Sequence, residues 1–78
     1  MITSIRKMSL KTGNCLQEKI YSLSVEKALI AYFEQEKSNY NTWQYPTKLN
    51  KKMHKSKKIN TWFVPINNDI VIYAEKIK

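Results

Sequence analysis

The side chains best suited to chemistry gather in one acid-free stretch of the sequence, residues 37–68. An aromatic patch opens this stretch, a basic run follows, and a tryptophan comes soon after: Tyr40, Trp43, Tyr45, Lys48, Lys51, Lys52, Lys55, Lys57, Lys58 and Trp62. Ammonium groups can follow phosphates while aromatic rings stack on bases, which is how proteins hold single-stranded nucleic acid. We therefore predict a nucleic-acid-binding site made of these residues.

A purely structural interpretation of the same residues competes with this one. In a small domain, tryptophans such as Trp43 and Trp62 more often complete the core than bind a ligand. A lysine run in a connection is most often a solvated loop. The segment around Trp43 is either a recognition loop or a plug at the exit of a helix, with Pro46 holding Tyr45 in extended geometry, and we slightly favour the plug.

The charge of the whole chain points to an anionic partner. Fourteen basic and six acidic residues give a net charge of +8, which attracts nucleic acid, an anionic membrane or an acidic protein. Almost all of this charge is lysine, and Lys, Asn and Ile share A/T-rich codons, so codon bias is an alternative source of it. Arg6 is the only arginine, so we expect contacts mainly to a nucleic-acid backbone, with little sequence specificity. The sequence does not distinguish DNA from RNA as the ligand.

Residues for catalysis or metal binding are scarce. One cysteine and one histidine cannot supply four zinc ligands, and one glycine cannot make a phosphate-binding loop. Catalysis by Cys15 or a serine would need His54, which has no carboxylate near it in sequence to orient it. Asp69 and Glu75 do not have the spacing of a metal nuclease. We expect no enzyme, no cofactor, no metal and no small-molecule substrate.

The 78 residues are enough for a single small domain with one modest core. The longest apolar run covers only residues 28–33, far short of the ~20 residues that cross a bilayer, and no secretory signal is visible. A lone cysteine excludes an internal disulfide framework. We therefore expect a cytoplasmic protein without a membrane partner.

The elements that must position the candidate site are a helix and a hairpin. Apolar residues at helical spacing predict an amphipathic helix over about 25–37, capped by Ser24. Runs rich in β-branched and aromatic residues predict a C-terminal hairpin of about 59–66 and 70–75 with turn residues between them. Pro65 argues for an edge or a strand end. The expected fold class is α+β, with the helix packed on a small antiparallel sheet.

Other segments leave alternatives open. Residues 16–23 are either a strand leading into the helix or a short helix, and we favour a strand over 19–23. Residues 2–10 either pair as another strand or are loose, so 1–11 could be an extension, and Met8 is an alternative start. Residues 46–58 are expected to form a basic connecting loop.

The function that these observations favour is that of a small basic accessory protein that binds nucleic acid non-specifically through its lysine-rich loop and flanking aromatics. The alternative is a protein-interaction module that docks an acidic partner. Such a module could be a subunit of a larger assembly, or a small inhibitor or adaptor of the kind that A/T-rich phages and mobile elements encode. Exposed aromatics would then serve as its hot spots.

Overall fold

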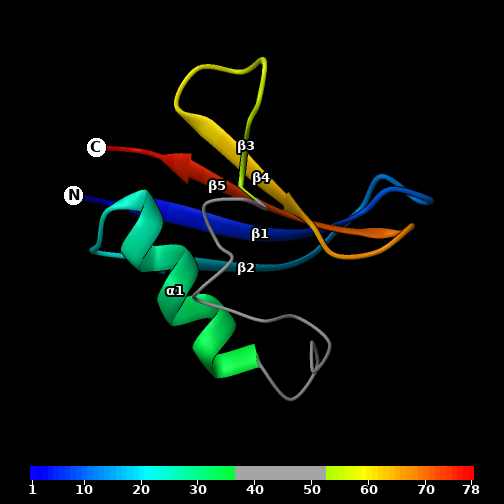
Figure 1. The fold of residues 1–78 in the computed structure, drawn as a ribbon, viewed down its shortest axis with the longest axis horizontal. Coiled ribbons are helices and arrows are strands. Elements are labelled where there is room, and N and C mark those ends of the chain that lie inside the picture. Colours follow the sequence, from blue (N-terminus) through cyan, green and yellow to red (C-terminus); the bar gives the residue numbers. More distant parts are fainter. Residues whose placement is uncertain (37–52) are drawn as a thin grey trace.

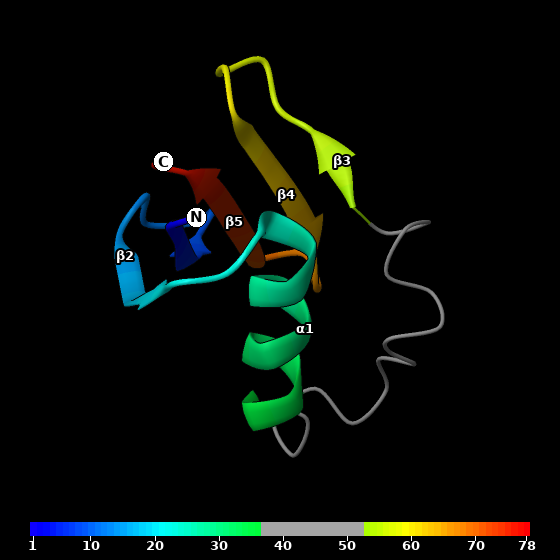
Figure 2. The same ribbon diagram turned by 90° about the vertical axis from the view of Figure 1, so that its left-hand side faces the viewer.

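The computed structural model describes residues 1–36 and 53–78. One helix packs on one face of a five-stranded antiparallel sheet (Figures 1 and 2). The elements along the chain are β1 (Thr3–Ser9), β2 (Cys15–Tyr21), α1 (Val25–Glu36), β3 (His54–Lys55), β4 (Thr61–Pro65) and β5 (Ile70–Lys76). Their order across the sheet is β2-β1-β5-β4-β3. The predicted α+β class is confirmed.

Helix α1 forms where the apolar spacing predicts it. The Ser24 hydroxyl accepts the backbone N–H of Lys27 at 3.4 Å, and the Ser24 carbonyl accepts that of Ala28 at 2.8 Å, so Ser24 caps the helix as expected. The apolar stripe is buried along the length of the helix: Ala28, Leu29, Tyr32 and Phe33. The structure describes this helix to Glu36, and the expected last residue, Lys37, lies outside the described residues.

The amino-terminal half supplies two strands. Of the alternatives for residues 2–10, the structure has the strand: β1 lies between β2 and β5, so this segment is in the middle of the sheet and is not a loose extension. Of the alternatives for residues 16–23, it again has the strand, but β2 begins at Cys15 rather than near residue 19. The earlier start follows from pairing, since Cys15 already faces Met8 of β1.

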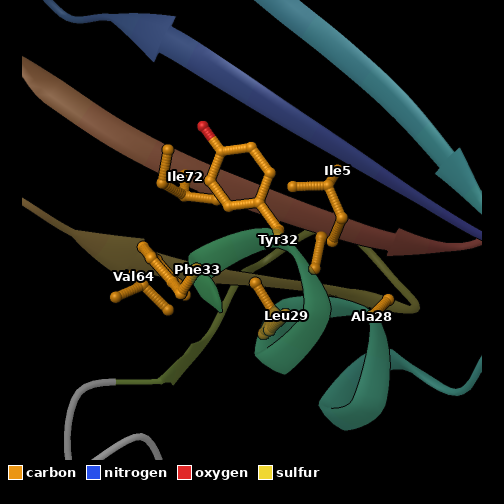
Figure 3. Packing of buried hydrophobic residues seen from close by; sticks show 8 residues of the cluster. Ile5, Ala28, Leu29, Tyr32, Phe33, Val64 and Ile72 are labelled. Carbon is orange, nitrogen blue, oxygen red and sulfur yellow. The ribbon is translucent and has the colours of Figure 1, made fainter. Parts of the chain in front are cut away.

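The core lies between α1 and the three central strands (Figure 3). Ile5 of β1 faces Ala74 of β5, and Ile72 of β5 faces Val64 of β4. All four side chains are at most 1% exposed and pack against the buried stripe of α1. Ile70, Ile72 and Ala74 alternate along β5 and share the face toward α1, with Ile72 and Ala74 in the core and Ile70 packed against it.

The carboxy-terminal hairpin is present with slightly different limits, because β4 begins two residues later than expected and β5 runs one residue further. Pro65 ends β4, which suits a residue that cannot donate to a sheet. His54 and Lys55, expected within the 46–58 loop, instead pair with Phe63 and Trp62 and form β3. That part of the loop expectation was wrong because sequence periodicity cannot reveal a two-residue strand.

Candidate nucleic-acid interface

The sheet has a second face, opposite α1, and the side chains of four residues line up across it. Residues next in sequence to the buried core point to this face, since side chains alternate along a strand. Strand register then aligns Arg6 with Tyr73, Tyr73 with Phe63, and Phe63 with His54. We call these four residues the cross-strand row. Helix α1 packs on the other face, against β1 and β5. Some side chains of this second face are buried as well, those of Ser4, Thr61 and Val71.

Three of the four members of the row are rings in contact. The ring centroids of Phe63 and Tyr73 are 6.0 Å apart, and those of His54 and Phe63 are 5.4 Å apart. Both pairs are tilted, at 44° and 30°. Phe63 and Tyr73 are half-buried, and His54 is exposed. The row therefore presents a continuous aromatic surface that reaches the edge of the sheet at β3.

The turn between β3 and β4 places a lysine over the same face. The N–H of Ser56 donates to the carbonyl of Thr61 at 3.0 Å, and the N–H of Lys58 donates to the Ser56 hydroxyl at 3.2 Å. Asn60 completes the turn with φ = 58°, a left-handed conformation that asparagine tolerates better than most residues. These hydrogen bonds define the turn, and the turn fixes the position of the Lys58 backbone.

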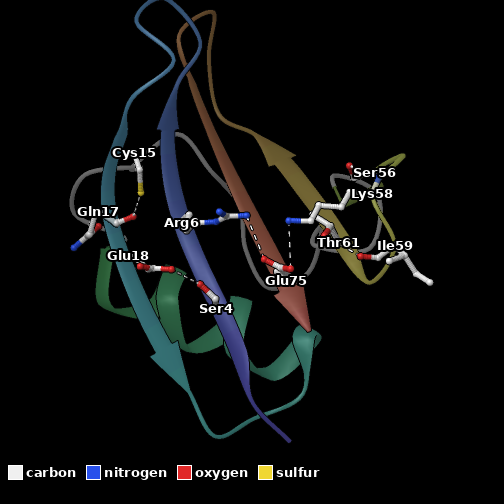
Figure 4. A network of polar contacts seen from close by, with 10 residues as sticks. All are labelled: Ser4, Arg6, Cys15, Gln17, Glu18, Ser56, Lys58, Ile59, Thr61 and Glu75. Atoms are coloured by element: carbon white, nitrogen blue, oxygen red, sulfur yellow. Dashed lines mark hydrogen bonds and ion pairs between the residues drawn. The ribbon is translucent and has the colours of Figure 1, made fainter. Parts of the chain in front are cut away.

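Glu75 lies between two cations on this face (Figure 4). Its carboxylate oxygens are 3.4 Å from Arg6 Nη2 and 3.4 Å from Lys58 Nζ. Charge-assisted hydrogen bonds are usually nearer 2.7–2.9 Å, so both contacts are loose. The side chains of these pairs are partly exposed, at 31% for Arg6, 59% for Lys58 and 24% for Glu75, and ion pairs in contact with solvent contribute about 0–1 kcal/mol. An incoming anion could therefore replace the Glu75 carboxylate at small cost.

A hollow of about 230 Å³ opens beside this ion pair. It is lined by Arg6, Met8, Ser56, Lys58, Thr61 and Tyr73. Pockets that enclose a whole small molecule usually measure about 300–1,000 Å³, so this hollow suits one flat group rather than a complete ligand. Arg6 Nε is buried and has no hydrogen-bond partner among the described residues. An unsatisfied buried donor costs roughly 1–3 kcal/mol, but this atom has almost no accessible surface, so a group in the hollow would not reach it.

Four of the predicted site residues are described, and they fall on different parts of the molecule. Lys57 and Lys58 are exposed in the β3–β4 turn. Lys55 and Trp62 face each other on the helix side of the sheet, with Lys55 Nζ 4.8 Å from the centre of the Trp62 ring. Trp62 is half-buried and lines a separate hollow of about 330 Å³ near the start of α1. It therefore does not share a face with Phe63 and Tyr73.

The remaining predicted site residues lie outside the described residues: Tyr40, Trp43, Tyr45, Lys48, Lys51 and Lys52. Whether those aromatics share a face with the lysines stays untested. The sequence interpretation omitted Arg6, Phe63 and Tyr73 as site residues. The available signal is strand alternation, which puts Tyr73 on the face opposite Ile72 and Ala74 but does not identify its partners on neighbouring strands.

Other chemistry finds little support in the described part of the chain. No group of three or more His, Cys, Asp and Glu residues there could hold a metal ion. Cys15 is exposed, and its Sγ contacts the carbonyl of Gln17 at 3.4 Å. Within residues 1–36 and 53–78, no helix has the length and hydropathy to span a membrane.

Comparison with protein-family models, with curated proteins and with solved structures finds no match to this chain. The interpretation of the cross-strand row therefore depends on its own geometry and charge.

Proposed function

We propose that this protein is a small accessory protein that binds nucleic acid with little sequence specificity. Lysines of the 48–58 run contact phosphates, and the aromatic face of the sheet contacts bases. The observation that carries the proposal is the β3–β4 turn, which holds Lys58 over the same face as Phe63 and Tyr73. Cations beside stacking rings are the two components that single-strand binders combine.

Low specificity follows from the types of side chain available. Lysine is a flexible point charge, whereas the bidentate fork that reads guanine belongs to arginine. The only arginine, Arg6, lies in the middle of a strand and contacts Glu75. The chain therefore offers many phosphate contacts and few groups that could distinguish one base from another.

A salt-titrated binding assay tests the proposal. Labelled single-stranded and duplex DNA and RNA are titrated with the protein and with a variant in which Lys51, Lys52, Lys57 and Lys58 become Gln. We expect binding at about 50 mM salt that weakens steeply as salt rises, and a large loss in the variant. Lys55 is left unchanged because its ammonium bonds the carbonyls of Lys58 and Thr61 and supports the turn.

The result that would overturn the proposal is the absence of binding at low salt, or binding that the four substitutions leave unchanged. Circular dichroism and thermal unfolding of the variant must match those of the parent chain. Lys57 and Lys58 are exposed and do not belong to the buried core, and we expect both measurements to be preserved.

A protein-interaction module is the second candidate, and one observation favours it. Strand β2 is an outer strand of the sheet, and two of its large apolar side chains, Leu16 and Ile20, are 53% and 61% exposed. Unpaired strand edges with apolar side chains can add a strand from another chain. Co-purification with Leu16→Ser and Ile20→Ser variants tests this candidate, since an edge-docked partner should be lost from both.

A further inference from the structure

The spacing of the rings on the face opposite α1 bears on which form of nucleic acid that face could accept. Phe63 and Tyr73 are 6.0 Å apart, whereas consecutive bases in a duplex are stacked about 3.4 Å apart along each strand. In a duplex, neighbouring bases also cover one another's faces. Two protein rings at the observed spacing can each stack on a base only if those bases have separated.

The hollow beside Tyr73 gives one such base a place. Tyr73 forms part of its wall, with Arg6 and Lys58 also lining it. Its size of about 230 Å³ suits one flat group. Phe63, aligned with Tyr73 on the neighbouring strand, offers a second ring for the adjacent base.

Two cations could bind the phosphate that links those two bases. Arg6 and Lys58 converge from two sides on the Glu75 carboxylate (Figure 4). Carboxylate and phosphate are both recognised by such cations, so a phosphate oxygen can take the position of the carboxylate. Glu18 is the other acid on this face, across from Arg6, and it already accepts the Ser4 hydroxyl at 2.8 Å. The two cations, Arg6 and Lys58, are thus matched by two acids, Glu18 and Glu75, and a phosphate must displace the Glu75 carboxylate to reach both cations.

We propose that the cross-strand row binds single-stranded nucleic acid, with one base against Tyr73 in the hollow, the next on Phe63, and their linking phosphate between Arg6 and Lys58. This inference rests on the proposed nucleic-acid binding and adds the strandedness of the ligand and the residues that select it. DNA and RNA single strands share the chemistry that the row recognises. The contact through base faces excludes an intact duplex from this mode.

The test measures how substitution of each ring changes the affinity for single-stranded and for duplex nucleic acid. Fluorescence anisotropy follows the binding of homopyrimidine DNA and RNA strands of about 12 nucleotides and of a duplex of the same length, at about 50 mM salt. The variants are Phe63→Leu and Tyr73→Leu, which keep apolar bulk but remove the ring. Stacking on one ring is worth roughly a 5- to 150-fold change in affinity, so we expect each variant to weaken single-strand binding within that range and to leave duplex binding unchanged.

Matched controls separate loss of stacking from loss of fold. Tyr73→Phe keeps the ring and should keep the affinity. Tyr21→Leu removes a half-buried tyrosine on the helix side of the sheet, and it should leave binding unchanged even if stability falls. In the unsubstituted protein, NMR signals of the Phe63 and Tyr73 ring protons should shift upfield when the single strand binds, while those of Tyr21 stay in place.

The outcomes distinguish this inference from the function on which it rests. If the lysine substitutions abolish binding but both ring variants bind single strands normally, nucleic-acid binding stands and the stacking mode is wrong. Equal affinity for duplex and single strand, with no shift of the ring signals, overturns the mode in the same way. If the unsubstituted protein binds no nucleic acid, the proposed function and this inference both fail.

Discussion

At the scale of single residues, Glu75 is the side chain that competes most directly with a bound phosphate. It contacts Arg6 and Lys58, both at 3.4 Å, and its own side chain is 24% exposed. Removing its charge should release both cations. We expect Glu75→Gln to raise the affinity for single-stranded nucleic acid by about two- to fivefold, since each loose ion pair is worth up to about 1 kcal/mol. Anisotropy titrations at fixed salt measure the change.

The same substitution also raises the net charge of the protein by one, so a control of equal charge is needed. Glu26→Gln supplies it, because Glu26 is exposed in the first turn of α1, on the other side of the sheet. A local effect requires Glu75→Gln to increase the affinity more than Glu26→Gln does. Equal gains from the two variants would show that only the total charge matters.

The residues of the candidate site differ in how far the sequence reveals them. Lys57 and Lys58 are visible because a run of lysines is a local pattern. Tyr73 is partly visible, since alternation along its strand separates it from Ile72 and Ala74. Arg6 could not be found, because its position beside Tyr73 depends on a pairing between strands almost seventy residues apart in the sequence. A single sequence contains no local signal for such a pairing.

At the scale of elements, those that depend on local sequence patterns can be predicted, whereas the pairing of strands distant in the sequence cannot. Helix α1 and the β4–β5 hairpin follow from short-range periodicity and turn chemistry, and both were predicted. The placement of β1 between β2 and β5 was not predicted, although a strand was one of the two alternatives for residues 2–10. Antiparallel pairing of β1 with β5 joins the two ends of the chain, and the free energy that fixes it comes from burial of Ile5 against Ala74 and α1 rather than from local propensity.

Asp69 ties together the two turns at one end of the sheet. Its carboxylate accepts the backbone N–H of Lys11 at 3.0 Å and the hydroxyl of Ser9 at 2.7 Å. These hydrogen bonds, chiefly the one from Lys11, lower the pKa of the Asp69 carboxyl below its ordinary value of 3.8. The anion is therefore favoured in the folded state, and the turn residue also anchors the β1–β2 turn to the β4–β5 turn.

We expect Asp69→Asn to lower the melting temperature at neutral pH. Because folding lowers the pKa, the stabilisation is present above about pH 3.8 and is lost as the pH falls through the lower, folded-state pKa. The difference in melting temperature between the two proteins should therefore shrink in strong acid. Thermal unfolding followed by circular dichroism at neutral and acidic pH checks this. A difference that stays constant with pH would contradict an electrostatic role for the carboxylate.

At the scale of the whole molecule, the acids and the lysines are unevenly distributed. Four of the six acids belong to β2 and α1: Glu18, Glu26, Glu34 and Glu36. Residues 37–68 contain no acid at all. The excess of positive charge is thus concentrated in the part of the chain that includes the β3–β4 turn. If nucleic acid binds by contact with that region, lysines there must matter more than lysines elsewhere.

The salt dependence of binding can separate local contact from general attraction. Each phosphate contact on a single strand contributes about −0.7 to the slope of log K against log salt concentration. Replacing Lys57 and Lys58 with Gln should therefore make the slope shallower by about 1.4, if each lysine neutralises one phosphate. Replacing Lys11 and Lys27 with Gln removes the same charge, but Lys11 lies in the β1–β2 turn and Lys27 is exposed on α1. That control should leave the slope nearly unchanged, and equal slopes for the two double variants would mean that net charge alone, without a defined interface, accounts for the binding.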